Sequence, residues 1–110
     1  MSVRRDRKFY TSLALHEAVA EHLAETPVYV TISGLHGASK VRQHAHGGAV
    51  ELIDEWVAAL ERSDTRHLRE LLIGEDEHSM DMRNTTVFLS VLGQDERRMI
   101  LDRVYSNAAE

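Results

Sequence analysis

The chain has 110 residues, of which 43% are hydrophobic and 28% are charged, and its formal net charge is −5 at pH 7. This composition is typical of one soluble globular domain, here residues 1–110, and no apolar run approaches the roughly 20 residues that a membrane span needs. The absence of cysteine excludes disulfides and thiolate chemistry and favours a cytoplasmic location.

The first half of the chain begins with a short basic segment, residues 1–7, which we expect to be a flexible arm. Apolar residues then recur at near-helical spacing and predict a helix from Lys8 to Glu25. Thr26-Pro27 should end this helix, because proline disfavours helical backbone in the residue before it. The β-branched, alternating run at 28–33 predicts a strand.

Residues 34–48 form a Gly/His-rich stretch with four of the six glycines and three of the seven histidines. Few large apolar residues occur in it, so we expect a long loop with a short extended piece near Val41.

Two helices and a strand are predicted next. The apolar stripe at 49–62 indicates a helix, and Ser63-Asp64 can cap a shorter helix that Gly74 ends. A polar connector at 75–78 follows. Apolar side chains on both faces of 85–92 predict a covered central strand, and Asp95 caps a last helix.

Together these elements predict an α+β fold with about four helices and two to three short strands, in the order α-β-(loop)-α-α-β-α. Two strands alone rarely form a stable sheet. Either a hairpin strand within 39–45 completes the sheet or a second copy of the chain does, and we expect a homodimer.

The histidines of the loop are the candidate metal ligands. On an extended segment His44 and His46 point the same way, and His36 and Glu51 lie near them in the sequence. We therefore predict a possible divalent metal site formed by these four residues, with no other cofactor.

Charge suggests where a partner would bind. Residues 51–77 hold three basic and nine acidic side chains, a balance of −6, which would attract a basic partner. Candidate contact residues within and beside this region are Glu75, Asp76 and Glu77, with Lys40 and Arg42 in the loop. The two loop cations and the basic arm can also hold an anion or nucleic acid.

Three functions follow from these features. The first is a small acidic, non-catalytic interaction or regulatory module, of an inhibitor, immunity-like or phage-type accessory kind, that binds another protein. The second is a metal-dependent enzyme that uses His36, His44 and His46. The third is a nucleic-acid-binding protein that uses the basic arm, Lys40 and Arg42. No membrane partner is expected.

Overall fold

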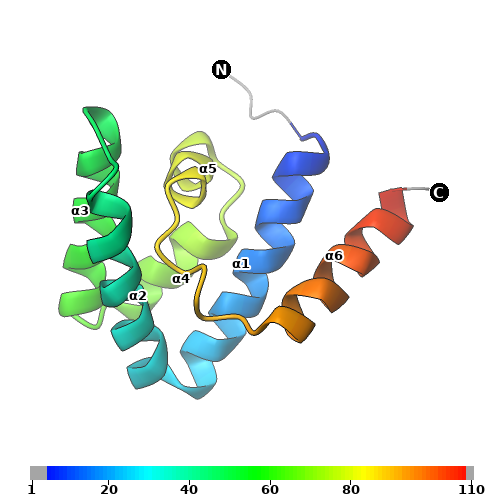
Figure 1. Cartoon of the computed structure of the whole chain (residues 1–110), viewed down its shortest axis with the longest axis horizontal. Coiled ribbons are helices and arrows are strands. Elements are labelled where there is room, and N and C mark those ends of the chain that lie inside the picture. The colour runs from blue at the N-terminus through cyan, green and yellow to red at the C-terminus, as the bar shows by residue number, and fades with distance from the viewer. Residues whose placement is uncertain (1–4, 109–110) are drawn as a thin grey trace.

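The computed structural model describes residues 5–108 and forms six helices over this range, with no strand. The predicted α+β fold is therefore wrong, and the chain is all-helical (Figure 1). Its radius of gyration is 13.6 Å, close to the value of about 13 Å for a compact domain of this length. The helices are α1 (Arg7–Glu25), α2 (Pro27–Arg42), α3 (Gly48–Glu61), α4 (Thr65–Ile73), α5 (Glu77–Asn84) and α6 (Gln94–Ala108).

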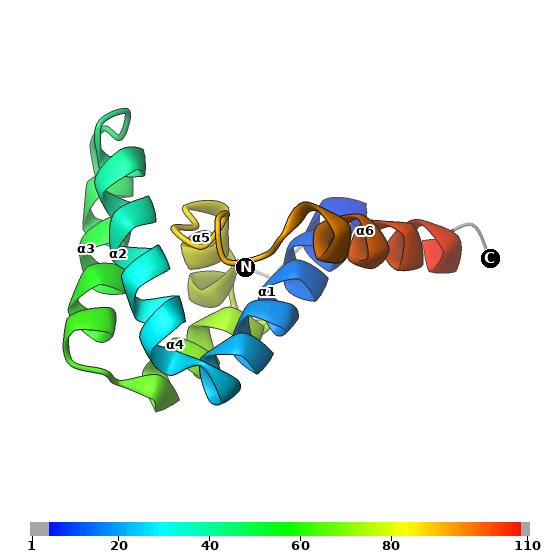
Figure 2. The same ribbon diagram turned by 60° about the horizontal axis from the view of Figure 1, so that its bottom comes forward.

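Helix α1 lies at the centre of the fold and contacts α2, α4, α5 and α6. Helices α2 and α3 pair on one side of it, with α4 and α5 packed between them and α1 (Figure 1). Helix α6 extends away on the opposite side (Figure 2), and α1 is the one helix of the described chain that it contacts. No described helix is both long and apolar enough to cross a membrane.

The first predicted strand, residues 28–33, lies within α2. The chain does break at Thr26 as expected, but Pro27 then occupies the first turn of a new helix, where its missing N–H costs nothing. Val30, Gly34 and Ala38 are the buried residues of this helix and recur every four positions. Tertiary packing of this stripe overrides the strand propensity of the β-branched residues.

The predicted loop at 34–48 is also mostly helix. Helix α2 continues to Arg42, and only residues 43–47 separate it from α3. Gly34 and Gly37 therefore lie inside a helix, on the side that receives residues 85–91: a Cβ at Gly34 would lie 2.9 Å from Phe88 Cε1, and one at Gly37 would collide with the Val87 carbonyl oxygen. These glycines allow another segment to approach the helix closely.

The second predicted strand, residues 85–92, is an irregular segment that crosses the body of the molecule between α5 and α6 (Figure 1). Val87, Phe88 and Val91 are buried, whereas Leu89 is 61% exposed. Burial does not alternate along the chain, so the segment has no covered strand faces. It is held instead by packing against the two glycines of α2.

Helices α3, α4 and α6 form where the sequence patterns predicted them, but α6 begins at Gln94, so Asp95 lies within its first turn and is not its cap. Asp64 caps α4, accepting a hydrogen bond from the His67 backbone N–H at 3.1 Å, as predicted. The predicted polar connector at 75–78 is instead the start of α5, capped by Asp76, which accepts from the Ser79 backbone N–H. Of the predicted flexible arm, residues 1–4 lie outside the described part, and Arg7 already belongs to α1.

The core lies between α1, α2, α3, α4, α5 and the crossing segment. Trp56 is fully buried at its centre, with an edge-to-face contact to Phe88 at 4.9 Å between ring centroids. Helix α6 buries Ile100 against α1, outside this main cluster. The largest fully buried side chains are those of Trp56, Phe9, Ile53, Leu60, Leu68, Leu72, Met82, Val30 and Val87.

Candidate functional site

The predicted metal ligands are distributed over three elements. His36 is exposed on α2, His44 and His46 lie in the 43–47 connection, and Glu51 is in the first turn of α3. The extended backbone that would align His44 with His46 is not formed, because His44 N–H still donates to the Val41 carbonyl in a helical turn. Within residues 5–108, no three His, Asp or Glu side chains are arranged to hold a metal ion.

The predicted partner-binding residues fall in two separate places. Lys40 is exposed on α2, and Arg42 forms an ion pair with Asp54 of α3. Glu75 and Glu77 are exposed beside α5, and Glu75 pairs with Arg5 at 3.0 Å. The two groups therefore lie on different elements, one on α2 and the other at the start of α5.

The acidic region at 51–77 is largely engaged within the fold. Six of its nine carboxylates accept hydrogen bonds or ion pairs from the same chain, which are Asp54, Glu55, Asp64, Glu70, Glu75 and Asp76. Most of these carboxylates therefore cap helices or pair with other side chains of the same chain, and fewer are left to attract a basic partner.

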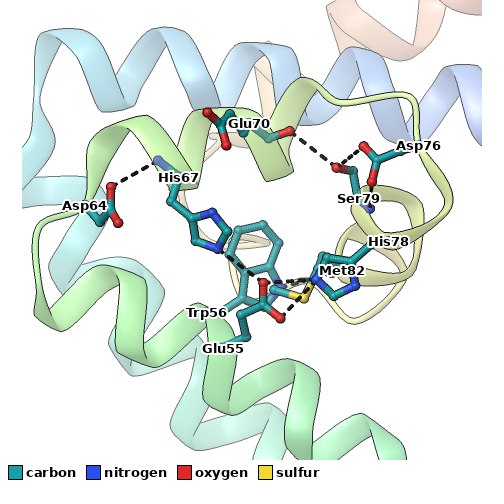
Figure 3. Close-up of polar contacts among 9 residues, drawn as sticks. All are labelled: Glu55, Trp56, Asp64, His67, Glu70, Asp76, His78, Ser79 and Met82. Carbon is teal, nitrogen blue, oxygen red and sulfur yellow. Dashed lines mark hydrogen bonds and ion pairs between the residues drawn. The ribbon is translucent and has the colours of Figure 1, made fainter.

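The densest polar cluster of the structure centres on Glu55 of α3 (Figure 3). Its carboxylate accepts from His67 Nε2 of α4 at 3.2 Å and from His78 Nε2 of α5 at 3.0 Å. Because a carboxylate only accepts, both imidazoles carry a proton on Nε2. One carboxylate thus joins three helices. Its side chain is 31% exposed, so solvent weakens each contact to a contribution of about 0–1 kcal/mol.

Next to this cluster, a cleft of about 760 Å³ separates α4 from α5. Both charge signs line it, with Arg66 and Arg69 against Glu70 and Asp76. The hydrogen bond to Glu55 raises the pKa of His78, whereas the hydrogen bonds from Ser79 lower the pKa of Asp76. The cleft is therefore a mixed-charge surface in which both carboxylates already have partners, Glu70 with Arg66 and Asp76 with Ser79.

A second polar network fixes the crossing segment to α1. Buried His16 donates from Nδ1 to the Ser12 carbonyl at 2.7 Å, and its Nε2 accepts from the Thr86 hydroxyl at 2.8 Å. The Thr86 oxygen in turn accepts from the Phe88 backbone N–H. Burial lowers the pKa of His16 to about 4, so the ring is neutral at pH 7.

Protonation of His16 should couple folding to pH. Its folded-state pKa of about 4 lies below the unfolded value of 6.5, so between these values the unfolded chain binds a proton that the folded chain does not. The stabilisation is complete above pH 6.5, decreases as the pH falls towards 4, and amounts to about 3 kcal/mol. The raised pKa of His78 acts in the opposite direction, but that side chain is 51% exposed and its effect is smaller.

Urea unfolding at pH 7 and at about pH 4.5 measures this effect. His16→Gln should reduce the difference in the free energy of unfolding between pH 7 and about pH 4.5. His46→Gln, at an exposed position, should leave this difference unchanged. An equal pH dependence in wild type and His16→Gln would contradict the assignment.

Arg83 of α5 is a buried cation that donates hydrogen bonds to carbonyl groups at the C-terminal end of α4. Its Nη1 donates to the carbonyls of Leu71 and Leu72, at 2.9 and 3.4 Å. These carbonyls lie in the last turn of α4, where no further helical N–H is present to pair with them. The Nε and Nη2 atoms of Arg83 are buried and have no hydrogen-bond partner.

Exposed large apolar side chains gather in two places, on α2 at Val28, Tyr29 and Ile32 and around α6. Met99 is 71% exposed and Tyr10 of α1 is 49% exposed, and both border grooves between the two helices. We define the α1–α6 surface by Tyr10, Leu13 and Ala14 of α1 with Met99 and Val104 of α6. The periodicity of 94–108 predicted this helix but not which of its apolar residues would remain exposed.

Comparison with known proteins finds no matching family model, and no curated protein or solved structure with significant similarity. Functional conclusions therefore depend on the residues described above.

Proposed function

We propose that this protein is a non-catalytic interaction module that acts by binding another protein, and that it assembles as a homodimer through the α1–α6 surface. The observation that carries the proposal is the position of α6, a 15-residue helix packed against one other helix. An amphipathic helix gains most of its stability from burying its apolar face. A partner on the α1–α6 surface would complete that burial.

The grooves beside this surface have room for side chains of a partner. One, of about 580 Å³, is bordered by Tyr10, Leu13 and Val104, and the next, of about 710 Å³, by Met99 and Ile100. Aromatic residues and methionine are enriched at the centres of protein interfaces. The exposed apolar side chains and the adjoining grooves are therefore typical of a protein-binding surface.

Charge on this surface favours a second copy as the partner. Glu17 and Arg103 border both grooves, but Arg7 lines only the groove at the N-terminal end of α1, whereas Glu21, Glu96 and Asp102 line only the other. The first end is therefore the more basic and the second the more acidic, although Glu96 also accepts a hydrogen bond from His22 Nε2. A two-fold axis that places two α1 helices antiparallel would bring the basic end of one copy to the acidic end of the other. Such an arrangement is self-complementary, as an isologous dimer requires.

Sedimentation equilibrium over a concentration series tests the proposal. We expect a mass near twice the 12.5 kDa of one chain at micromolar concentration. Met99→Glu should weaken dimerisation by at least about tenfold, because it would bury an unpaired charge in the interface. Val28→Glu is the matched comparison, because it makes the same kind of change in the other group of exposed apolar side chains, on α2 beside Tyr29 and Ile32, where Val28 is 70% exposed, and its replacement should not change the mass.

A mass of 12.5 kDa at every concentration would contradict the homodimer, and so would equal effects of the two substitutions. If the wild type is monomeric, capture of a partner from lysate that Met99→Glu abolishes and Val28→Glu retains would still support the interaction module.

The metal-dependent enzyme and the nucleic-acid-binding protein remain predictions from sequence. The former requires His36, His44 and His46 to converge, and the latter requires Lys40 and Arg42 to act together. Elemental analysis of the purified protein tests the former, and the salt dependence of DNA or RNA binding tests the latter.

A further inference from the structure

Another groove lies beside α1, lined by a different set of residues from the α1–α6 surface except for Arg7, which borders both. It measures about 480 Å³, and α1, α5, the crossing segment and α6 all contribute to it. Three of its side chains are cationic, and none carries a carboxylate, although acidic residues outnumber basic ones in the chain. Its lining consists of Arg7, Lys8, Thr11, Ser12, Leu15, His16, Arg83, Asn84, Thr86, Leu89 and Tyr105.

The buried cation in this lining is Arg83, whose side chain has two polar atoms without a hydrogen-bond partner. Three carboxylates lie near this charge, those of Asp76, Glu75 and Glu17, but none of them accepts a hydrogen bond from Arg83. Glu75 pairs with Arg5, and Asp76 accepts from Ser79. Burial removes water from the N–H groups of this guanidinium. The carboxylates do not accept hydrogen bonds from these groups, so the lost hydrogen bonds to water are not replaced. An anion in the groove would lie in the field of this charge at low dielectric.

The rest of the groove combines exposed charge with an apolar wall. Arg7 and Lys8 are exposed on the first turn of α1, and the Arg7 guanidinium lies 5.4 Å from the centroid of the Tyr105 ring. Leu89, 61% exposed, and Leu15 provide aliphatic surface. Hydroxyl and amide groups of Thr11 and its neighbours in the lining can donate hydrogen bonds.

We propose that this groove binds a small organic anion, with its carboxylate or phosphate group beside Arg7, Lys8 and Arg83 and its apolar part against Leu89 and Tyr105. Ligand sites of this kind join a mainly apolar wall to a few polar groups that fix orientation. The small volume of the groove and the net charge of −5 favour a small molecule over a polyanion.

Isothermal titration of the full chain with benzoate and with phenyl phosphate tests the proposal, and benzyl alcohol serves as the neutral probe. At least one anion should bind saturably with one site per chain, and benzyl alcohol should bind at least about tenfold more weakly. Lys8→Glu should weaken anion binding by about tenfold or more. Lys40→Glu is the matched control, because it makes the same charge change at an exposed position outside the groove and should not alter binding.

Leu89→Ser provides a second variant that does not disturb the buried core, since Leu89 is exposed. It should weaken binding of the aromatic anions but not of inorganic phosphate. The absence of saturable binding up to about 10 mM would overturn the proposal, as would equal binding of benzyl alcohol or equal affinities in Lys8→Glu and Lys40→Glu. The readout is ligand binding, which is measured separately from the sedimentation that tests the dimer.

Discussion

Trp56→Ala should lower the free energy of unfolding by about 3–5 kcal/mol, the largest effect we expect from one substitution in this chain. The indole is fully buried and packs edge to face against Phe88. Its Nε1–H donates to the Met82 carbonyl at 3.0 Å and to the Thr85 carbonyl at 3.1 Å. Alanine would leave a cavity and would also leave both carbonyls at the end of α5 without this donor.

Urea unfolding followed by far-UV circular dichroism measures the loss. Trp56→Phe is an intermediate case, because it retains an aromatic ring in the core but removes the donor and part of the indole volume, so we expect a loss of about 1–2 kcal/mol. A loss below about 1 kcal/mol for Trp56→Ala would show that the surrounding core is not packed as described.

Burial of Trp56 could be predicted from sequence because it depends on a local pattern. Val50, Ile53, Trp56, Val57 and Leu60 recur at helical spacing within 49–62, and the helix forms with Ile53, Trp56 and Leu60 buried. The Asp64 cap of α4 is equally local, because the cap and the N–H that it accepts are three residues apart. Contacts between residues this close in the chain can be recognised from the spacing of residue types in the sequence.

The two predicted strands were wrong because their patterns depend on distant partners. The run at 85–92 has apolar residues at five of its eight positions and on both faces of an extended chain, which is typical of a strand covered on both faces. No neighbouring strand exists in the described chain to pair with it. Its buried residues meet α2 and the core instead, a contact between segments about 50 residues apart.

The polar networks could not be predicted for the same reason. Glu55 meets His67 and His78 at separations of 12 and 23 residues, and His16 meets Thr86 at a separation of 70. In the sequence, His67 and His78 have no spacing that links them to Glu55. Only the packing of α3, α4 and α5 brings the three side chains together.

The glycine pair in α2 gives the sharpest test of the packing that the sequence did not reveal. Helix propensity alone predicts that Gly37→Ala stabilises the protein by up to about 1 kcal/mol, because Gly37 lies in the interior of a helix. The structure predicts the opposite sign, since the new Cβ would collide with the Val87 carbonyl oxygen. Backbone cannot rotate away as a side-chain end can, so we expect a net loss of about 1–3 kcal/mol or more.

Chemical unfolding of three glycine variants decides between propensity and packing. Gly34→Ala should cost less than Gly37→Ala, because its Cβ would lie 2.8 Å from Leu60 Cδ1 and 2.9 Å from Phe88 Cε1, which are side-chain atoms that can shift. Gly48→Ala is the control, because it starts α3 with no atom within 4 Å of the added Cβ, and it should be neutral or slightly stabilising. If Gly37→Ala were as stable as Gly48→Ala, the Val87 carbonyl could not lie against Gly37 of α2 as the structure places it.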